Sequence, residues 1–308
     1  MKALADIEII ELSVNQLGRR PSSFEFLGAG MFSNAYLLHI GGEKLVLRIG
    51  SSYTPFLKDE WAFNLFRDSP LAVPEVYAKG PIGEYFFCFS SYIAGTRFDQ
   101  LNAIEIEGSL TALFDAHDCI ARIELPVNSG FGFLDPAGHG IYNSWHDALT
   151  NFGDWPHTIL SRKGEAFLGW DKVFRETILD EGLARRSMEK INSLLPYCPE
   201  MRGLIHGDFG FDNVLMRHGN VSAILDWAEC RCGDPLYDIA SLECHGSRHN
   251  YRNSYRERLI NKNRLPRNYE ERMDCYMIHI MLCSCWLDAQ RGFHDYYEEG
   301  KKVLGRLL

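Results

Sequence analysis

Three oxygen-bearing side chains stand at defined intervals in one part of the chain. The segment LIHGDFGFDNVL carries Asp208 and, five residues later, Asn213, and the following AILDW carries Asp226 at the end of an apolar run. Phosphoryl transfer requires a carboxylate near the attacking hydroxyl and oxygen ligands that hold magnesium against the nucleotide phosphates. Asp208 can be that carboxylate, and Asn213 and Asp226 can be those ligands. Each residue alone could be an ordinary turn residue, but their combined spacing favours this chemistry.

The elements around these residues must bring the two ligands together. Short apolar runs at 213–216 and 221–225 flank Arg217-His218-Gly219-Asn220, whose Gly-Asn pair indicates a hairpin turn. Such a hairpin returns its two ends to one edge. Asn213 and Asp226 are therefore expected to face the same side of a cleft.

The motif of His206-Gly207-Asp208 through Asn213, followed by Asp226-Trp227, resembles the aminoglycoside phosphotransferase and choline kinase superfamily, whose members are relatives of protein kinases. The resemblance implies an α+β, two-lobed, protein-kinase-like fold. Residues 1–93 would form an N-lobe with a small antiparallel β-sheet, and residues 94–308 a mainly helical C-lobe that holds the catalytic, metal and acceptor sites. It also implies that ATP, or alternatively GTP, binds between the lobes with Mg²⁺.

The amino-terminal part of the chain fits this arrangement. Residues 24–49 alternate strand-forming residues with glycine turns and predict a three-stranded antiparallel meander. Residues 56–67 have apolar side chains near helical spacing, and residues 84–93 form an aromatic run that favours a strand. We place the lobe boundary after Ile93, because Ala94-Gly95-Thr96 suits a change of direction.

By the same resemblance, residues of the N-lobe are expected to contact the nucleotide. The run Gly28-Ala29-Gly30-Met31-Phe32-Ser33 looks like the glycine-rich loop that covers the phosphates, with Ser33 in place of a third glycine. The expected contacts from this loop are Gly28, Gly30 and Ser33. Main-chain groups of Ser91, Tyr92 and Ile93 would bond the adenine edge.

Arg48 occupies the position where this fold generally has a lysine directed at the phosphates. An arginine keeps the charge but changes the contact geometry. We expect Glu60 of the following helix to pair with Arg48, with the adjacent Asp59 as the rival partner.

Three further residues are expected to support the catalytic loop. His206 precedes Asp208, and the segment GDPLYDIA, which matches a recurrent motif of the superfamily, carries Asp234 and Asp238. We expect their hydrogen bonds to brace the loop. A helix cap ahead of Pro235 is a compatible role for Asp234.

The remainder of the C-lobe is predicted to be mostly helical. Residues 104–123, 170–195 and 270–290 carry helix-length apolar periodicity, and strand signals are confined to the hairpin. Residues 126–143 lack periodicity and predict a long loop.

The acceptor is expected to be a small hydroxylated molecule. Only Trp227 to Gly233 separate Asp226 from Asp234, too few residues for the segment with which protein kinases dock peptides. Residues 129–149, with VLRIG and VPEVYAKG, resemble hygromycin B phosphotransferases, which implies an aminoglycoside acceptor and antibiotic resistance. The amines of such an acceptor could bind three acidic residues of the C-lobe: Asp212, Glu229 and Glu243. An ordinary surface role is at least as good an interpretation for each of them.

Composition limits the other classes of function. Lysine and arginine number 32 against 41 acidic residues, and this net charge of −9 argues against nucleic-acid binding. The amino terminus lacks an uninterrupted apolar core, and Cys275 to Leu287 is too short to span a bilayer. Nine scattered cysteines favour reduced thiols in a cytoplasm, and their C-x-C pairs lack zinc-site spacing.

Two alternatives and the oligomeric state stay open from the sequence. A kinase for choline, homoserine, a methylthio-sugar or a macrolide would keep every catalytic residue named above. A nucleotide-binding but inactive pseudokinase would keep the fold. The chain could be a monomer or a dimer.

Overall fold

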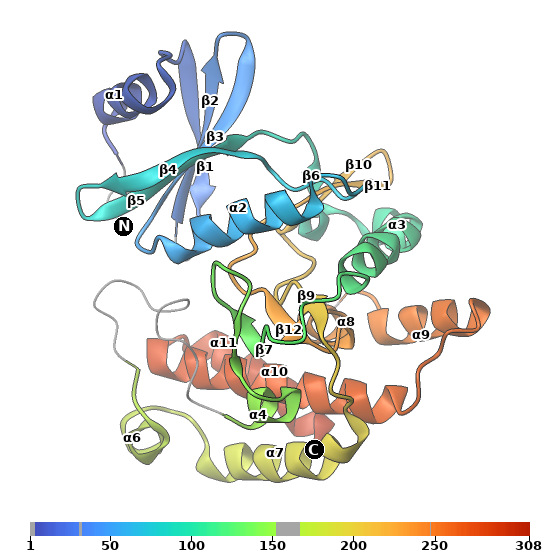
Figure 1. Ribbon diagram of the computed structural model, residues 1–308. Helices are drawn as coiled ribbons and strands as arrows, with labels where there is room; N and C mark the ends of the chain where they lie inside the picture. Colours follow the sequence, from blue (N-terminus) through green and yellow to red (C-terminus); the bar gives the residue numbers. More distant parts are fainter. Residues whose placement is uncertain (1–3, 31–32, 152–166, 247) are drawn as a thin grey trace.

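The structure, a computed structural model, describes residues 4–30, 33–151, 167–246 and 248–308. It has two lobes, with a β-sheet in the first and mainly helices in the second (Figure 1). Both features were expected from the sequence. The boundary between residues 93 and 94 stays a prediction, and it falls in the segment that joins a strand of the first sheet to a strand of the next.

The first lobe is built on a five-stranded antiparallel sheet with the order β1-β2-β3-β5-β4. The predicted meander is confirmed as β1 to β3, and the predicted helix and aromatic strand are α2 and β5. The elements are α1 (Asp6–Leu17), β1 (Ser23–Ala29), β2 (Ser33–Ile40), β3 (Glu43–Gly50), α2 (Thr54–Phe66), β4 (Val76–Ile82) and β5 (Tyr85–Ser91).

One face of this sheet forms a small core with α1. In β3 the alternate residues Leu45, Leu47 and Ile49 are buried, as expected for a strand with one covered face. Ile9 and Leu12 of α1 belong to the same hydrophobic cluster. The sequence analysis did not predict α1.

The helices of the second lobe pack around α10, whose middle is buried on nearly every side. The predicted helices at 104–123 and 270–290 are present as α3 and α10. The helices are α3 (Ala103–Ala121), α4 (Trp145–Thr150), α6 (Trp170–Glu176), α7 (Glu181–Leu194), α8 (Leu236–His245), α9 (Tyr251–Asn261), α10 (Tyr269–Arg291) and α11 (His294–Leu307), with 3₁₀ turns at Phe98–Gln100 and Leu195–Tyr197.

The expectation of one helix over residues 170–195 is wrong. Thr177 has an extended backbone that ends α6, and the carboxylate of Asp180 accepts a hydrogen bond from the main-chain N–H of Leu183 at 2.8 Å to begin α7. The apolar periodicity continues across this break because both helices pack on the same core.

The second lobe also has more strands than the sequence predicted. The hairpin was expected, whereas five further strands within the described residues were not, and two of them lie within the predicted loop at 126–143. The strands are β6 (Thr96–Arg97), β7 (Phe131–Leu134), β8 (Gly140–Tyr142), β9 (Gly203–Ile205), β10 (Val214–Arg217), β11 (Asn220–Ile224) and β12 (Arg231–Gly233). They form two small sheets with the orders β11-β10-β6 and β8-β7-β12-β9.

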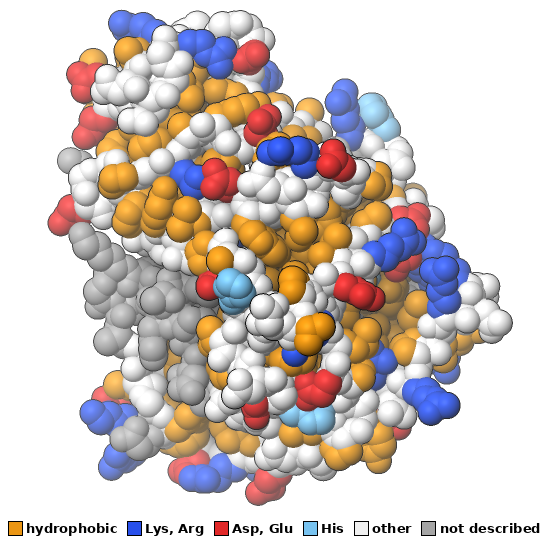
Figure 2. All heavy atoms as spheres, in the orientation of Figure 1, with side chains coloured by type: hydrophobic (Ala, Val, Ile, Leu, Met, Phe, Trp, Pro, Cys, Tyr) orange, Lys and Arg blue, Asp and Glu red, His pale blue; other side chains and the backbone are white. Residues whose placement is uncertain are grey.

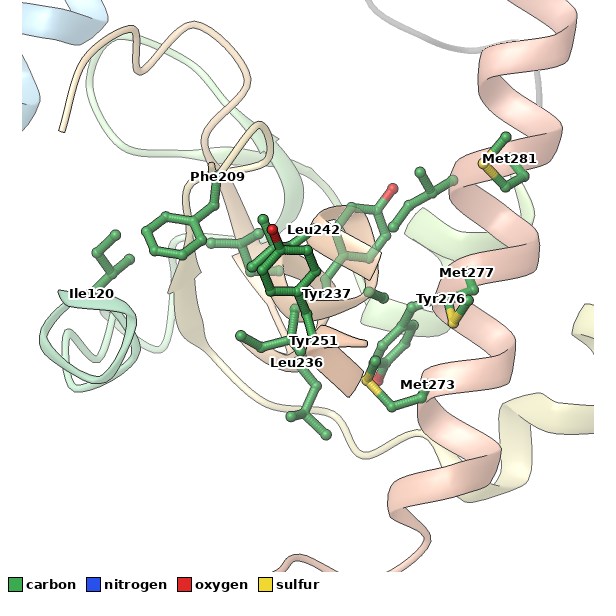
Figure 3. Packing of buried hydrophobic residues seen from close by; sticks show 14 of the residues in the cluster. Ile120, Phe209, Leu236, Tyr237, Leu242, Tyr251, Met273, Tyr276, Met277 and Met281 are labelled. Carbon is green, nitrogen blue, oxygen red and sulfur yellow. The ribbon is translucent and has the colours of Figure 1, made fainter. Parts of the chain in front are cut away.

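A large hydrophobic cluster joins the second lobe to α2. Ala62 and Phe66 of α2 pack in the same cluster as α3, α8 and α10, and Figure 3 shows Phe209, Tyr237 and Tyr276 within it. Helix α2 therefore packs against both lobes. Among the described helices, none is long and apolar enough to cross a membrane.

Candidate active site

The catalytic loop runs from the end of β9 to the start of β10 and carries Asp208. Gly207 has φ 87°, and a Cβ there would lie 2.2 Å from the main-chain oxygen of Glu229, so the position requires glycine. Phe209 is buried in the large cluster (Figure 3), whereas the side chain of Asp208 is exposed. The buried phenyl ring thus anchors the loop while the carboxylate stays accessible.

Asn213 is held against Asp208. Its Nδ2 donates to Oδ2 of Asp208 at 2.7 Å and to the main-chain oxygen of Asp208 at 3.0 Å. These bonds use both amide hydrogens, so the amide oxygen Oδ1 is the atom that remains to accept another partner.

The hairpin brings Asp226 to Asn213, as the spacing predicted. The main-chain N–H of Leu225 donates to the main-chain oxygen of Asn213 at 2.8 Å. Asp226 follows with φ 55°, a left-handed backbone that is uncommon for aspartate. Its Oδ1 accepts a hydrogen bond from the N–H of Ala228 at 3.3 Å.

His206 and Asp238 connect these two loops to α8. The two carboxylate oxygens of Asp238 accept from the main-chain N–H groups of His206 and Gly207, each at 2.8 Å. Nδ1 of His206 accepts from the N–H of Asp208 at 3.3 Å, so Nε2 carries the proton and donates to the oxygen of Leu225 at 2.9 Å. These contacts are of the bracing kind that we expected for both residues.

The oxygen atoms of Asn213 and Asp226 suit a magnesium ion, which prefers hard oxygen ligands. In the described part of the chain, no group of three or more His, Cys, Asp or Glu side chains is arranged to hold a metal by itself. Two protein ligands leave most of an octahedral shell to other donors, such as nucleotide phosphates and water. This chemistry fits a metal that binds together with a nucleotide.

The surroundings raise the pKa values of both site carboxylates. Partial desolvation by the surrounding protein atoms, followed by the charges of Glu229, Asp226 and Asp212, raises the pKa of Asp208 to about 8, although the residue keeps exposed surface. Partial desolvation and the charge of Asp59 likewise raise the pKa of Asp226, which Arg48 partly offsets. A concentration of negative charge of this kind favours cationic ligands.

A cleft of about 510 Å³ lies between the first sheet and the hairpin. Asp208 and Asn213 are not among its lining residues. Asp226 and Asp212 line it. So do seven of the eight residues that we predicted to bind the nucleotide: Gly28, Gly30, Ser33, Arg48, Ser91, Tyr92 and Ile93. Met31 and Phe32 of the expected glycine-rich loop lie outside the described residues.

The predicted pairing of Arg48 with Glu60 is wrong. Arg48 Nη2 forms its ion pair with Asp59 Oδ2, while Glu60 points elsewhere and binds Lys79 at 2.5 Å. Burial would lower the pKa of Arg48, but the charges of Asp59 and Asp226 outweigh it and raise that pKa. Asp59, which lines the cleft, is therefore the residue that supports Arg48.

Asp234, which we expected to brace the catalytic loop, instead joins α8 to α10. Its carboxylate accepts two hydrogen bonds from Arg272 at 2.7 Å, one from the hydroxyl of Tyr276 at 2.6 Å and one from the N–H of Leu236 at 3.1 Å. The last contact is made to the first residue of α8, whose N-cap position is Pro235, so Asp234 binds the start of this helix from one residue ahead of the cap.

The three acidic candidates for acceptor binding differ in their positions. Asp212 is exposed and lines the cleft. Glu229 is held by Arg231 at 3.1 Å and acts electrostatically on Asp208. Glu243 accepts from the N–H of Arg252 at 2.8 Å and lies outside the cleft lining, so its role in acceptor binding stays a prediction.

The sequence analysis missed two basic residues near the site. Arg97 lines the cleft and pairs with Asp99 at 2.6 Å. Lys58 of α2 is fully buried and donates to the main-chain oxygen of Ala228 at 2.6 Å. Neither residue lies in a motif. Lys58 directly precedes Asp59, the partner of Arg48, and this position could have indicated that Lys58 lies near the site.

The sequence comparison decides the family. Residues 23–275 match the phosphotransferase enzyme family (APH). The chain belongs to this family. Hygromycin-B 4-O-kinase from Escherichia coli is 31% identical to this family member over 220 residues, which make up 70% of the chain and 60% of that relative. The match thus spans less than two thirds of the relative's length.

Solved structures of other phosphotransferases have the same fold. A thermostable mutant of aminoglycoside phosphotransferase APH(4)-Ia, in ternary complex with AMP-PNP and hygromycin B, matches with a TM-score of 0.83 and 25% identity, covering 97% of both chains. Wild-type aminoglycoside 2'-phosphotransferase-IIIa in its GDP complex matches with a TM-score of 0.68 and 16% identity, covering 99% of this chain and 98% of that chain. The kinase-like fold implied by the resemblance is confirmed.

Proposed function

We propose that this phosphotransferase moves the γ-phosphate of ATP to a hydroxyl of an aminoglycoside of the hygromycin B type. The observation that carries the proposal is the Asp208–Asn213 pair close to Asp226, which lines a cleft together with Arg48. A carboxylate, two oxygen ligands and a phosphate-binding cation are the parts that phosphoryl transfer needs.

Each residue has a role in the proposed reaction. Asp208 orients the acceptor hydroxyl and accepts its proton as that oxygen bonds to the γ-phosphorus and the bond to ADP breaks. Asn213 and Asp226 would hold Mg²⁺, which neutralises charge on the phosphates when bound. Arg48, fixed by Asp59, contacts the phosphate oxygens, and main-chain groups of residues 91–93 bond the adenine edge.

The negative charges around Asp208 support a cationic acceptor. Asp212 and Glu229 both raise the pKa of Asp208, so their charges act close to the carboxylate at which the acceptor hydroxyl would bind. The relatives named for hygromycin B point to the same class of acceptor. On this basis, antibiotic resistance is the proposed biological effect.

The same proposal includes a cytoplasmic location and GTP as a second phosphate donor. None of the nine cysteines, all of which lie in the described part of the chain, forms a disulfide, which is usual for a cytoplasmic protein. GTP is a second candidate donor, because a related phosphotransferase forms a GDP complex.

The test is an acceptor panel with Mg²⁺ and either ATP or GTP. It should include hygromycin B, other aminoglycosides, choline, homoserine, a methylthio-sugar and a macrolide, with mass spectrometry to detect the phosphorylated product. Transfer to a non-aminoglycoside alone would overturn the substrate assignment. No transfer to any acceptor, with intact nucleotide binding, would favour an inactive binding protein.

A further inference from the structure

Lys58 of α2 is fully buried, which is unusual for a lysine. A buried ammonium normally faces a carboxylate, because an unpaired charge is costly to remove from water. In the described residues, the ammonium of Lys58 forms no ion pair, and its one hydrogen bond goes to the main-chain oxygen of Ala228 at 2.6 Å. Burial lowers the pKa of Lys58 accordingly. A buried ammonium that is this costly to maintain indicates a role for Lys58 beyond packing.

The adjacent residue of α2 binds the same segment. Oδ1 of Asp59 accepts from the main-chain N–H of Trp227 at 3.0 Å. Two consecutive residues of α2 thus bind two consecutive residues of the loop. Asp59 accepts from the N–H of Trp227, and Lys58 donates to the carbonyl of the next residue. The rings of Phe66 and Trp227, 5.0 Å apart, add an apolar contact between the same two elements.

The segment that α2 binds also contacts the carboxylate of Asp226. Asp226 has the left-handed φ of 55°, and its side chain accepts from the N–H of Ala228. A strained backbone of this kind persists only where the surroundings fix it. The bonds from Lys58 and Asp59 fix the two residues directly after Asp226.

We propose that Lys58 is a positioning residue for Asp226: its ammonium holds the carbonyl of Ala228 and so orients the carboxylate toward the metal and nucleotide. This inference rests on the proposed function, because it assumes that Asp226 binds magnesium. Helix α2 lies between the sheet of the first lobe and the body of the second (Figure 1). The metal-binding loop is therefore correctly shaped only while α2 is docked on it.

The test variant is Lys58→Met, which keeps the length of the side chain and removes its charge and donors. We expect faster amide hydrogen exchange over residues 226–230 in the protein without ligands. The magnesium concentration that half-saturates nucleotide binding should rise about 10-fold or more, as for the loss of a hydrogen bond from a charged group. Nucleotide binding without magnesium and the unfolding temperature should not fall, since a buried charge has been replaced by an apolar group.

Lys79→Met is the matched control. Lys79 also binds α2, through Glu60, and within the described residues it forms no ion pair with the loop at 226–230. The Lys79→Met variant should leave both the amide hydrogen exchange over residues 226–230 and the magnesium dependence of nucleotide binding unchanged. Lys58→Gln, with a neutral donor of shorter reach, should give intermediate values, and it replaces Lys58→Met in the comparison if that variant does not fold.

The outcomes separate this inference from the proposed function. A wild-type protein that binds no nucleotide with magnesium would overturn the proposed function and the metal role of Lys58 together. A wild-type protein that does bind, beside a Lys58→Met protein with unchanged exchange and magnesium affinity, would overturn this inference alone. Lost turnover with both of those measurements unchanged would also contradict it.

Discussion

Asn213 donates two hydrogen bonds to Asp208, one to the carboxylate at 2.7 Å and one to the main-chain oxygen at 3.0 Å. The proposed base and the proposed metal ligand therefore form one unit. Since this contact uses the amide nitrogen of Asn213, its oxygen stays available on the metal side. In the proposed reaction, the same pair of side chains would position the acceptor hydroxyl and the metal.

Asp208→Asn should lower the rate of phosphate transfer by about 10²- to 10⁴-fold, because an amide cannot accept the hydroxyl proton. Nucleotide binding with magnesium should persist, since neither metal ligand is changed. Steady-state kinetics and calorimetric titration with a non-hydrolysable ATP analogue measure the two effects. Unchanged turnover would remove Asp208 from the proposed mechanism.

The same substitution should stabilise the protein in a pH-dependent manner. The pKa of Asp208 is about 8 in the folded chain and about 4 in an unfolded one. Between these values the folded state holds a proton that the unfolded state has lost, so the wild-type aspartate costs more stability as the pH rises. The gain in unfolding temperature for Asp208→Asn should grow from about pH 4 to about pH 8 and then level off.

Thermal unfolding of both proteins across this pH range, without magnesium, checks the direction. Glu299→Gln, which changes an exposed residue paired with Lys302, is the control and should show no comparable trend. A gain for Asp208→Asn that is constant with pH would contradict the raised pKa.

Asp59→Asn and Glu60→Gln should have very different effects, although the two residues are adjacent. Asp59 holds Arg48 and accepts from the N–H of Trp227, whereas Glu60 binds Lys79. We expect kcat/KM for ATP to fall about 10-fold or more for Asp59→Asn, because a charge-assisted bond to Arg48 is lost. Glu60→Gln should stay within about twofold of the wild type, as is usual for a partly exposed ion pair. A larger loss of kcat/KM for Glu60→Gln would instead support the pairing of Arg48 with Glu60 that the sequence predicted.

This pair of residues shows where the sequence was sufficient and where it was not. Asp208, Asn213 and Asp226 lie within one short segment, so spacing and a local hairpin were enough to bring them together. The partner of Arg48 depends on which face of α2 points at the sheet. The buried face of this helix, formed by Phe56, Lys58, Asp59, Ala62 and Phe66, includes two charged residues. Leu57, Trp61 and Leu65 are apolar but only partly buried, so the apolar pattern does not indicate that direction.

The missed strands have a different cause. Strands β6 to β9 and β12 have two to four residues each, too few for alternation to be recognised. They form because distant segments pair, as when β12 lies between β7 and β9. Long-range pairing of this kind leaves no local signal. The same holds for Asp234, whose partner Arg272 is 38 residues away.

Arg272→Met should lower the free energy of unfolding by about 3 to 5 kcal/mol, because it leaves the carboxylate of Asp234 buried without its cation. Asp234 is 1% exposed and Arg272 is 5% exposed, so water cannot replace the lost partner. Adding Asp234→Asn to this variant should recover much of the loss, since the amide oxygen can still accept from the hydroxyl of Tyr276. Urea denaturation of the two single variants and the double variant forms the required cycle.

The activity of the folded fraction should change little in the double variant, because Asp234 joins α8 to α10 and the catalytic loop is held by Asp238. Asp238→Ala is the comparison: it leaves the N–H groups of His206 and Gly207 buried without acceptors and should lower both stability and turnover. If the Asp234→Asn/Arg272→Met protein were stable but as inactive as Asp238→Ala, Asp234 would also act on the catalytic loop, and the separation of their roles would be wrong.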